Sequence, residues 1–157
     1  MIIRRACSKD IDKILDLLNQ VKQVHVNGRP DLFKPGTPKY NEDELNEMFV
    51  NDNKPMFVIC DEADKVCGYA LCQFKEIRDD AVLNDMKYLY IDDLCIDEAK
   101  RGQHLGKTLY EYVLQFAKDN GCRSLLLNVW SCNTSAQHFY EAMGLKPQRT
   151  YMEQLLV

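Results

Sequence analysis

Apolar residues recur along the chain with two different periods, and the longer period predicts four helices. Between Ile11 and Val21 they follow the three-to-four-residue spacing of an amphipathic helix, which Ser8 can cap. A second stripe of this kind runs from Leu105 to Phe116, and an Asn-Gly pair stops it at residues 120 and 121. The predicted helices cover residues 8–24, 42–52, 105–119 and 133–143.

Shorter β-rich runs predict the strands that lie between these helices. They cover residues 2–7, 56–60, 65–74, 86–97, 124–130 and 146–157. A proline-rich and glycine-rich stretch at 27–40 must be a loop. The element order is therefore β-α-α-β-β-β-α-β-α-β.

The unit from residue 87 to residue 129 is a strand, loop, helix and strand, which predicts a right-handed parallel crossover. The earlier hairpins make the rest of the sheet antiparallel. We therefore expect an α/β fold, or α+β in some schemes, with a mixed central sheet, helices on both faces and a single domain over residues 1–157.

Composition and charge exclude several classes of protein. Apolar residues make up 46% of the chain, but no run approaches the roughly 20 apolar residues of a membrane span. The charged start does not resemble a secretory signal, and a net charge of −4 disfavours nonspecific binding to nucleic acid. Seven cysteines without a C-x-x-C pair predict neither a disulfide scaffold nor a zinc site. We expect reduced thiols, a cytoplasmic location and no metal.

The stretch KRGQHLGKT, residues 100–108, is the first candidate for chemistry. It joins a predicted strand to a predicted helix, so its backbone N–H groups and the positive end of the helix dipole favour a phosphate. It is not a nucleotide-binding P-loop, because only three residues separate Gly102 from Gly106 and Arg101 stands where the first glycine belongs. A plain tight turn fits the loop alone equally well.

Two longer segments resemble one known family. LCIDEAKRGQHLGKTLYEYV is similar to the coenzyme A pyrophosphate motif of the GNAT acetyltransferases, and NVWSCNTSAQHFYEAMGLKP is similar to the second signature of that family. The element order matches over the whole chain. His104 replaces the first motif glycine and Leu145 replaces the usual phenylalanine. We expect His104 to have ordinary helix-start backbone angles and an exposed side chain.

The resemblance implies an N-acetyltransferase that moves an acetyl group from acetyl-CoA to a primary amine of a small molecule or peptide. Both substrates would bind together, and a homodimer is possible. In the family the end of the fourth strand pairs with the pantetheine arm, the glycine loop holds the pyrophosphate and a helix-capping asparagine touches the arm. The matching residues are Leu94, Cys95, Ile96, Arg101, Gly102, Gln103, His104, Leu105, Gly106, Lys107 and Asn133.

The resemblance also implies the residues that move protons. Tyr140, seven residues after Asn133, matches the family's general acid, although a core tyrosine would fit the same helix. Asp92 and Asp93 lie in an apolar strand, where carboxylates are costly unless they are paired or functional. Period-two alternation points them to opposite faces, so that at most one of the two can reach the acceptor site. Asp92 is the candidate base, directly or through water, and a paired carboxylate is the alternative.

The resemblance also implies that the loop at 24–40 and the segment at 74–88 cover the acceptor site, with Asp31, Phe33 and Tyr40 as candidate contacts. A loop held only by its prolines is the alternative. His25 is interpreted as a surface residue and Trp130 as a core residue. A noncatalytic acyl-CoA-binding module is the alternative function. It would keep the glycine loop but would not need Tyr140 or the aspartates.

Overall fold

The computed structural model of the protein describes residues 1–36 and 38–156, so Thr37 of the predicted loop and Val157 of the predicted last strand lie outside it. One sheet forms the middle layer, with strand order β1-β2-β3-β4-β5. The first four strands are antiparallel and β5 pairs with β4 in parallel. The strands are β1 (Ile2–Arg5), β2 (Met56–Cys60), β3 (Val66–Ile77), β4 (Met86–Ile96) and β5 (Ser124–Leu127).

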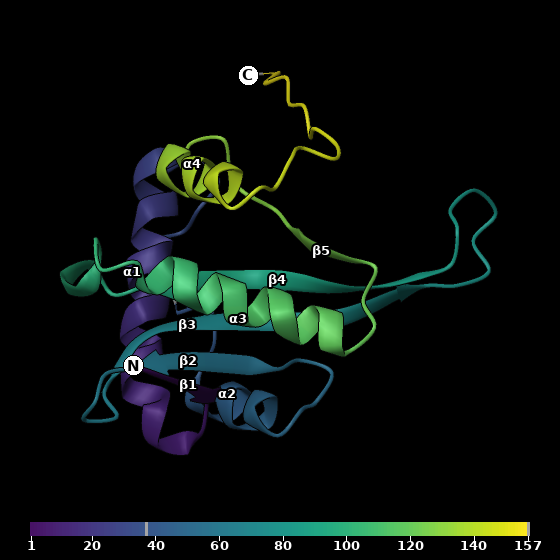
Figure 1. Ribbon diagram of the computed structural model, residues 1–157. Coiled ribbons are helices and arrows are strands. Elements are labelled where there is room, and N and C mark those ends of the chain that lie inside the picture. The colour runs from purple at the N-terminus through teal and green to yellow at the C-terminus, as the bar shows by residue number, and fades with distance from the viewer. Residues whose placement is uncertain (37, 157) are drawn as a thin grey trace.

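Helices cover both faces of this sheet, as the sequence predicts (Figure 1). They are α1 (Ile11–Gly28), α2 (Glu42–Phe49), α3 (Leu105–Asp119) and α4 (Thr134–Ala142), with 3-10 turns at Ser8–Asp10 and Glu98–Lys100. Helices α1 and α2 pack on one face, and α3 packs on the other with α4 beside it. The predicted mixed sheet between helices is confirmed. No helix in the described part of the chain is long and apolar enough to cross a bilayer.

The two faces of the sheet carry separate apolar cores. On the α1 face Ile14, Leu17 and Tyr69 are fully buried, and on the α3 face Leu89 and Leu109 are fully buried. The helical spacing on α1 and α3 therefore aims one stripe of each helix at the sheet. Burial of such side chains is the main stabilising contribution to a fold of this size.

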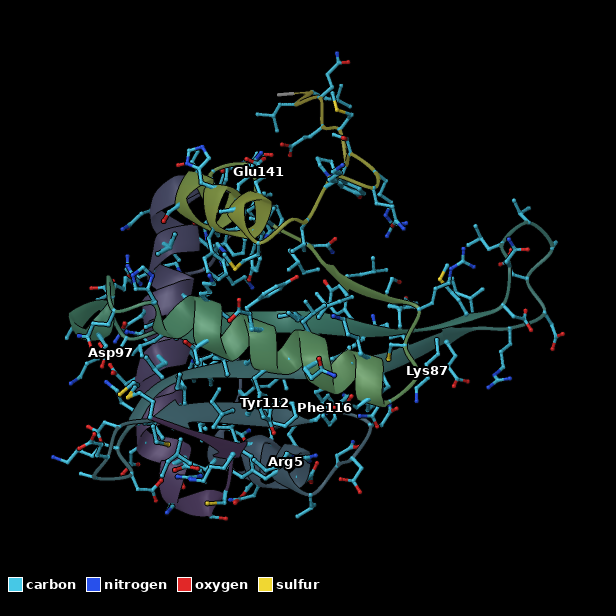
Figure 2. The ribbon with its side chains drawn as sticks, viewed as in Figure 1. Arg5, Lys87, Asp97, Tyr112, Phe116 and Glu141 are labelled. Atoms are coloured by element: carbon cyan, nitrogen blue, oxygen red, sulfur yellow. The ribbon has the colours of Figure 1, made fainter. Side chains whose placement is uncertain are left out.

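Aromatic side chains extend the second core toward β1 and β2. The rings of Tyr112 and Phe116 on α3 meet the Phe57 ring edge to face, with centroids 5.2 and 4.9 Å away. The guanidinium of Arg5 lies 5.9 Å from the centre of the same ring. Figure 2 shows Tyr112, Phe116 and Arg5 gathered on this side of the molecule. Aromatic packing thus covers Phe57 on this face of the sheet.

The predicted last strand is wrong. Residues 146–156 contain no strand, and this segment leads away from the sheet beyond α4 (Figure 1). Tyr151 is 101% exposed and Leu156 is 89% exposed. The side chains of residues 146–156 are of types that are common in strands. A strand also needs a neighbouring backbone to pair with, and composition does not show whether one is present.

Candidate active site

Strands β4 and β5, the last two strands of the sheet, separate after the pair Ile91–Leu127, and a cavity lies there. Their parallel register runs from the pair Tyr88–Ser124 to the pair Ile91–Leu127 and ends there. Residues 92–96 of β4 therefore have no strand neighbour on this side within the described chain, and their N–H and C=O groups on that edge are left for other partners. The cavity at the opening has a volume of about 1020 Å³.

Most of the predicted site residues line this one cavity. They are Asp92, Asp93, Leu94, Cys95, Ile96, Arg101, Gly102, His104, Leu105, Gly106, Lys107, Asn133 and Tyr140. Gln103 is exposed and is not part of the lining. Strand β4, the glycine loop, α3 and α4 thus each contribute predicted residues to the lining of this cavity.

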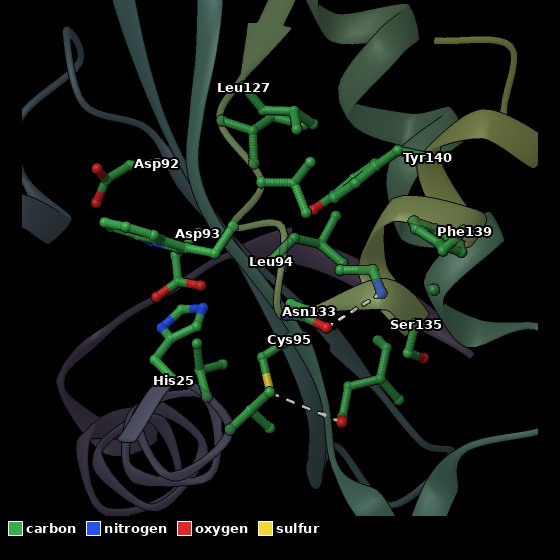
Figure 3. A pocket seen from close by; sticks show the side chains of 18 of the residues that line it. His25, Asp92, Asp93, Leu94, Cys95, Leu127, Asn133, Ser135, Phe139 and Tyr140 are labelled. Atoms are coloured by element: carbon green, nitrogen blue, oxygen red, sulfur yellow. Dashed lines mark hydrogen bonds between the residues drawn. The ribbon is translucent and has the colours of Figure 1, made fainter. Parts of the chain in front are cut away.

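A β-bulge in β4 overturns the expectation that the two aspartates face opposite ways. Asp93 is opposite Leu71 on β3 and Ile91 is opposite Cys72, so Asp92 is an extra residue without a partner on β3. An extra residue shifts the alternation of side chains by one. Both carboxylates therefore lie on the α1 face of the sheet, and Figure 3 shows them at the same side of the pocket.

The aspartate pair is held by three donors. Lys39 Nζ lies 2.9 Å from Asp92 Oδ2 and 3.7 Å from Asp93 Oδ2. The hydroxyl of Tyr40 donates to Asp92 at 3.2 Å, and the hydroxyl of Tyr69 donates to Asp93 at 2.9 Å. The Asp93 side chain is only 10% exposed, and its burial raises the pKa of the carboxyl despite Lys39 and Tyr69. Asp92 is therefore a paired carboxylate, which is the alternative given in the sequence analysis. Asp93 is nearly buried, and its pKa is raised.

Three aromatic side chains close the cavity next to Asp93. Phe33 stacks on His25 with centroids 5.0 Å apart and meets Trp130 edge to face at 4.9 Å. Burial lowers the pKa of His25, which disfavours its charged form. Trp130 is 44% exposed, so its interpretation as a core residue is wrong. The sequence analysis missed His25, Trp130 and Lys39 because only the fold brings α1, the following loop and the end of β5 together.

Two of the three acceptor contacts expected from the loop lie at the cavity, and the third does not. Phe33 lines the cavity, and Tyr40 contacts Asp92. Asp31 instead accepts two hydrogen bonds from Arg29, at 2.9 and 2.7 Å. Arg29 also binds Glu153, so this pair ties the end of α1 to the segment after α4.

The glycine loop enters α3 through two residues with left-handed backbone angles. Gly102 has φ 78°, which a glycine adopts without cost. His104 has φ 58° and ψ 13°, so the expectation of ordinary helix-start angles is wrong. The position requires the conformation that the family's glycine would favour, and histidine adopts it at a cost of about 1 kcal/mol.

Backbone donors of the loop point out of the helix end. Thr108 N donates to His104 O at 3.0 Å and is the first N–H of α3 with an intrahelical acceptor. The N–H groups before it are therefore available, including that of Leu105, whose side chain is buried in the core. The Arg101 and Lys107 side chains are exposed and carry positive charge at the same end. This end of α3 suits an anion.

Gly106 contributes a close approach rather than unusual backbone angles. A Cβ at this position would lie 3.4 Å from the Phe139 ring and 3.5 Å from Ile96. These are ordinary contacts, so the Cβ of an alanine would fit at this position.

Tyr140 and Asn133 reach the cavity from α4. The Asn133 side chain accepts a hydrogen bond from Ala136 N at 3.2 Å and caps the helix, as its sequence position predicts. The Tyr140 hydroxyl points into the opening between Leu94 and Leu127 (Figure 3). Burial raises the pKa of Tyr140, and Asp93 raises it further. The phenol is therefore protonated at neutral pH.

The Cys95 thiol of this cavity is kept in its protonated form. Burial raises the pKa of Cys95 to about 12, which keeps the thiol protonated and unreactive. Among the residues the structure describes, no group of three or more histidine, cysteine or acidic side chains is arranged to hold a metal ion. The titratable groups of the cavity include Tyr140, the two aspartates, His25 and Lys39.

Comparisons with known proteins agree with this geometry. Residues 19–145 match the model of the acetyltransferase (GNAT) family. Human N-acetyltransferase 8B is 37% identical over 103 residues, which cover 66% of this chain and 44% of the human protein. The chain thus spans less than half the length of that curated relative.

Solved structures share the whole fold. A crystal structure of a variant of the BH1408 protein from Bacillus halodurans is 29% identical, has a TM-score of 0.96 and covers 100% of both chains. An aminoglycoside N-acetyltransferase in complex with CoA has a TM-score of 0.71 and covers 98% of each chain, but at 14% identity it shows the fold alone. From the family match over most of its length, together with the signatures that converge on one cavity, the chain belongs to the GNAT acetyltransferase family.

Proposed function

We propose that the protein is an N-acetyltransferase, formed by one domain over residues 1–157, that transfers an acetyl group from acetyl-CoA to a primary amine of a small molecule or peptide. The observation that carries the proposal is the unpaired edge of β4. It has a carboxylate pair at one end, an anion-binding helix end at the other, and the protonated Tyr140 beside it.

The residues of the cavity fit acetyl-CoA. The free helix end near Gly102, with Arg101 and Lys107, suits a pyrophosphate. The N–H and C=O groups of Leu94 and the N–H of Ile96 suit the amide groups of a pantetheine arm, as in the addition of a strand to a sheet edge. The Ile96 carbonyl accepts a hydrogen bond from Arg101 Nε at 3.4 Å. A structure of similar fold has been solved with CoA. Acetyl-CoA, when bound, supplies the acetyl group as a reactive thioester.

The chain's own groups then handle charge and protons. A backbone N–H on the β4 edge is fixed before reaction, so it stabilises an oxyanion without reorganisation. Asp93, with its raised pKa, and the neighbouring Asp92 accept the proton that an alkylammonium must lose before attack. Tyr140 holds a proton next to the edge and donates it to the departing thiolate. The direct reaction needs no covalent enzyme intermediate, which agrees with the protonated state of Cys95.

Two further expectations stay predictions. The cysteines of the described chain are unpaired, and four of them are buried, which is the arrangement expected of a cytoplasmic protein. The resemblance to the family allows a homodimer.

Calorimetry and a thiol-release assay together test the proposal. We expect binding of acetyl-CoA and CoA but not of ATP, and release of CoA that depends on an added amine. The assay should cover polyamines, aminoglycosides, amino acids and short peptides. Binding of acetyl-CoA without amine-dependent thiol release from any of these classes would favour the noncatalytic module. Binding of ATP in place of CoA would contradict both functions.

A further inference from the structure

The ammonium group of Lys39 contacts both carboxylates of the candidate active site. Lys39 Nζ donates to Asp92 Oδ2 at 2.9 Å and lies 3.7 Å from Asp93 Oδ2. It reaches them from the loop between α1 and α2, which also forms part of the cavity wall. Among the lysines that line the cavity, Lys39 is the one whose ion pairs with the two carboxylates are recorded in the described chain.

The pair of carboxylates requires a cation at this point. Because of the bulge, Asp92 and Asp93 face the same space, and Asp93 is nearly buried. Two negative charges this close destabilise each other unless a positive charge lies between them. Burial lowers the pKa of Lys39, but the charges of Asp93 and Asp92 raise it overall, so the lysine remains protonated.

The lysine is nevertheless poorly placed for a permanent structural role. Its side chain is 41% exposed, and it extends from a loop rather than from a helix or strand. Holding such a flexible side chain in one place costs rotamer entropy, and a partly exposed ion pair gains little in return. A competing ammonium group with its own apolar stem can replace it at small cost.

We propose that Asp92 and Asp93 form the ammonium subsite of the acceptor, and that Lys39 occupies this subsite until a primary alkylammonium substrate displaces it. The inference rests on the proposed function and narrows it to acceptors whose amine ends an unbranched aliphatic stem, as it does in lysine. The rings of Phe33 and Trp130 beside the subsite supply an apolar wall for the rest of the acceptor.

A self-occupied subsite lowers the apparent affinity for the acceptor. The acceptor binds only the fraction of molecules in which Lys39 has left, so its apparent dissociation constant equals the intrinsic value divided by that fraction. Removing the ammonium group of Lys39 removes this competition. Removing a lysine that only supports the aspartates would instead leave acceptor affinity unchanged or weaken it.

The test compares Lys39→Met, which keeps a long apolar side chain without charge, with the wild type. The probe is n-butylamine, which has the same stem and amine as the lysine side chain. Its equilibrium binding is followed by the indole N–H resonance of Trp130, the single tryptophan, and its KM is measured by thiol release. We expect Lys39→Met to bind n-butylamine about tenfold more tightly and to lower its KM by a similar factor.

Matched variants separate displacement from a general charge effect. Lys39→Arg keeps the competing charge and should retain the weak binding of the wild type. Lys118→Met removes an exposed lysine of α3 that does not line the cavity, and it should also behave as the wild type. If Lys39→Met fails to fold by circular dichroism, Lys39→Gln replaces it.

Binding of n-butylamine tests the ammonium subsite, and thiol release tests the proposed acetyl transfer. Unchanged or weaker binding of n-butylamine to Lys39→Met overturns the ammonium subsite, whether or not acetyl transfer is seen. Tighter binding without thiol release in any variant supports the subsite and contradicts the proposed acetyl transfer.

Discussion

Three residues at the cavity have features that are unfavourable for the stability of the fold. Asp93 is nearly buried and has a raised pKa, Tyr140 presents a hydroxyl to an apolar opening, and His104 adopts left-handed angles. Each feature costs stability, and all three occur around one edge of β4. Such clustering is typical of active sites.

We expect Tyr140→Phe to reduce kcat by about a hundredfold or more and to leave the affinity for acetyl-CoA nearly unchanged. Phenylalanine keeps the ring contacts with Tyr110 and Phe139, at centroid distances of 6.4 and 5.2 Å, but it cannot donate a proton. Steady-state kinetics and calorimetry measure the two effects separately. The control is Tyr110→Phe, which removes a hydroxyl from the neighbouring ring on α3 and should retain activity. Wild-type kinetics for Tyr140→Phe would remove this residue from the mechanism.

The backbone of His104 allows a test of strain. We expect His104→Gly to raise the free energy of unfolding by up to about 1 kcal/mol, because glycine adopts φ 58° without a Cβ clash. His104→Ala keeps the Cβ and should give no gain. Urea denaturation of both variants measures the difference. An equal effect of glycine and alanine would show that the left-handed angles cost nothing here.

Whole elements are held in position by a few contacts between distant segments. Arg4 on β1 donates two hydrogen bonds to Asp10, at 2.8 and 2.9 Å, and a third to Asp64 in the turn between β2 and β3, at 3.0 Å. The Asp10 side chain is 3% exposed and lies directly before α1. One guanidinium therefore joins the first strand, the start of α1 and a hairpin turn.

We expect Arg4→Met to cost about 3 kcal/mol of unfolding free energy at neutral pH, because it leaves the Asp10 carboxylate buried without its cation. Urea denaturation measures this loss. Arg5→Met is the matched control, since its partner Asp52 is 99% exposed and their atoms lie 3.5 Å apart, and it should cost less than about 1 kcal/mol. Equal losses for the two variants would contradict the role of the buried pair.

The same pair makes stability depend on pH. Burial raises the pKa of Asp10, but Arg4 and the Cys7 N–H lower it below the unfolded value of 3.8. A depressed pKa contributes stability above the unfolded value, and this contribution is lost as the pH falls through the folded value. The difference between wild type and Arg4→Met should therefore shrink when denaturation is repeated near pH 3.

The sequence predicts the elements well and their exact geometry less well. The helical stripes on α1 and α3 and the capping residue Asn133 appear where their patterns indicate. The faces of Asp92 and Asp93 were predicted wrongly, because alternation assumes an unbroken ladder and a bulge has no mark in composition. The contact of Lys39 with these residues joins positions 53 and 54 residues apart and depends on the folded loop.

At the scale of the molecule, the exposed segment after α4 stands out. Residues 146–156 leave the sheet, and the large apolar side chains of Tyr151, Met152, Leu155 and Leu156 are all exposed. The described contact of this segment with the body is the ion pair between Glu153 and Arg29. Nearby, β5 is the last strand of the sheet and has one edge open. Clustered exposed apolar side chains commonly mark a surface that associates with another protein.

We expect the full chain to associate with itself through this segment, because burying its apolar side chains against a second copy removes them from water. Light scattering during size-exclusion chromatography should give a mass above 18.3 kDa that rises with protein concentration. Serine at positions 151, 152, 155 and 156 should return the mass to that of a monomer. A monomeric wild type over the whole concentration range would contradict this expectation.

The single extra residue at Asp92 changes which side chains of β4 face which layer of helices. Before it, odd-numbered side chains such as Ile91 face α3, and after it, odd-numbered side chains such as Cys95 face α1. Deleting Asp92 would restore a regular ladder in which Ile91 still faces α3 and Asp93 still faces α1. An in-frame loss of this one codon would therefore keep both faces of the strand in place and remove one carboxylate of the pair.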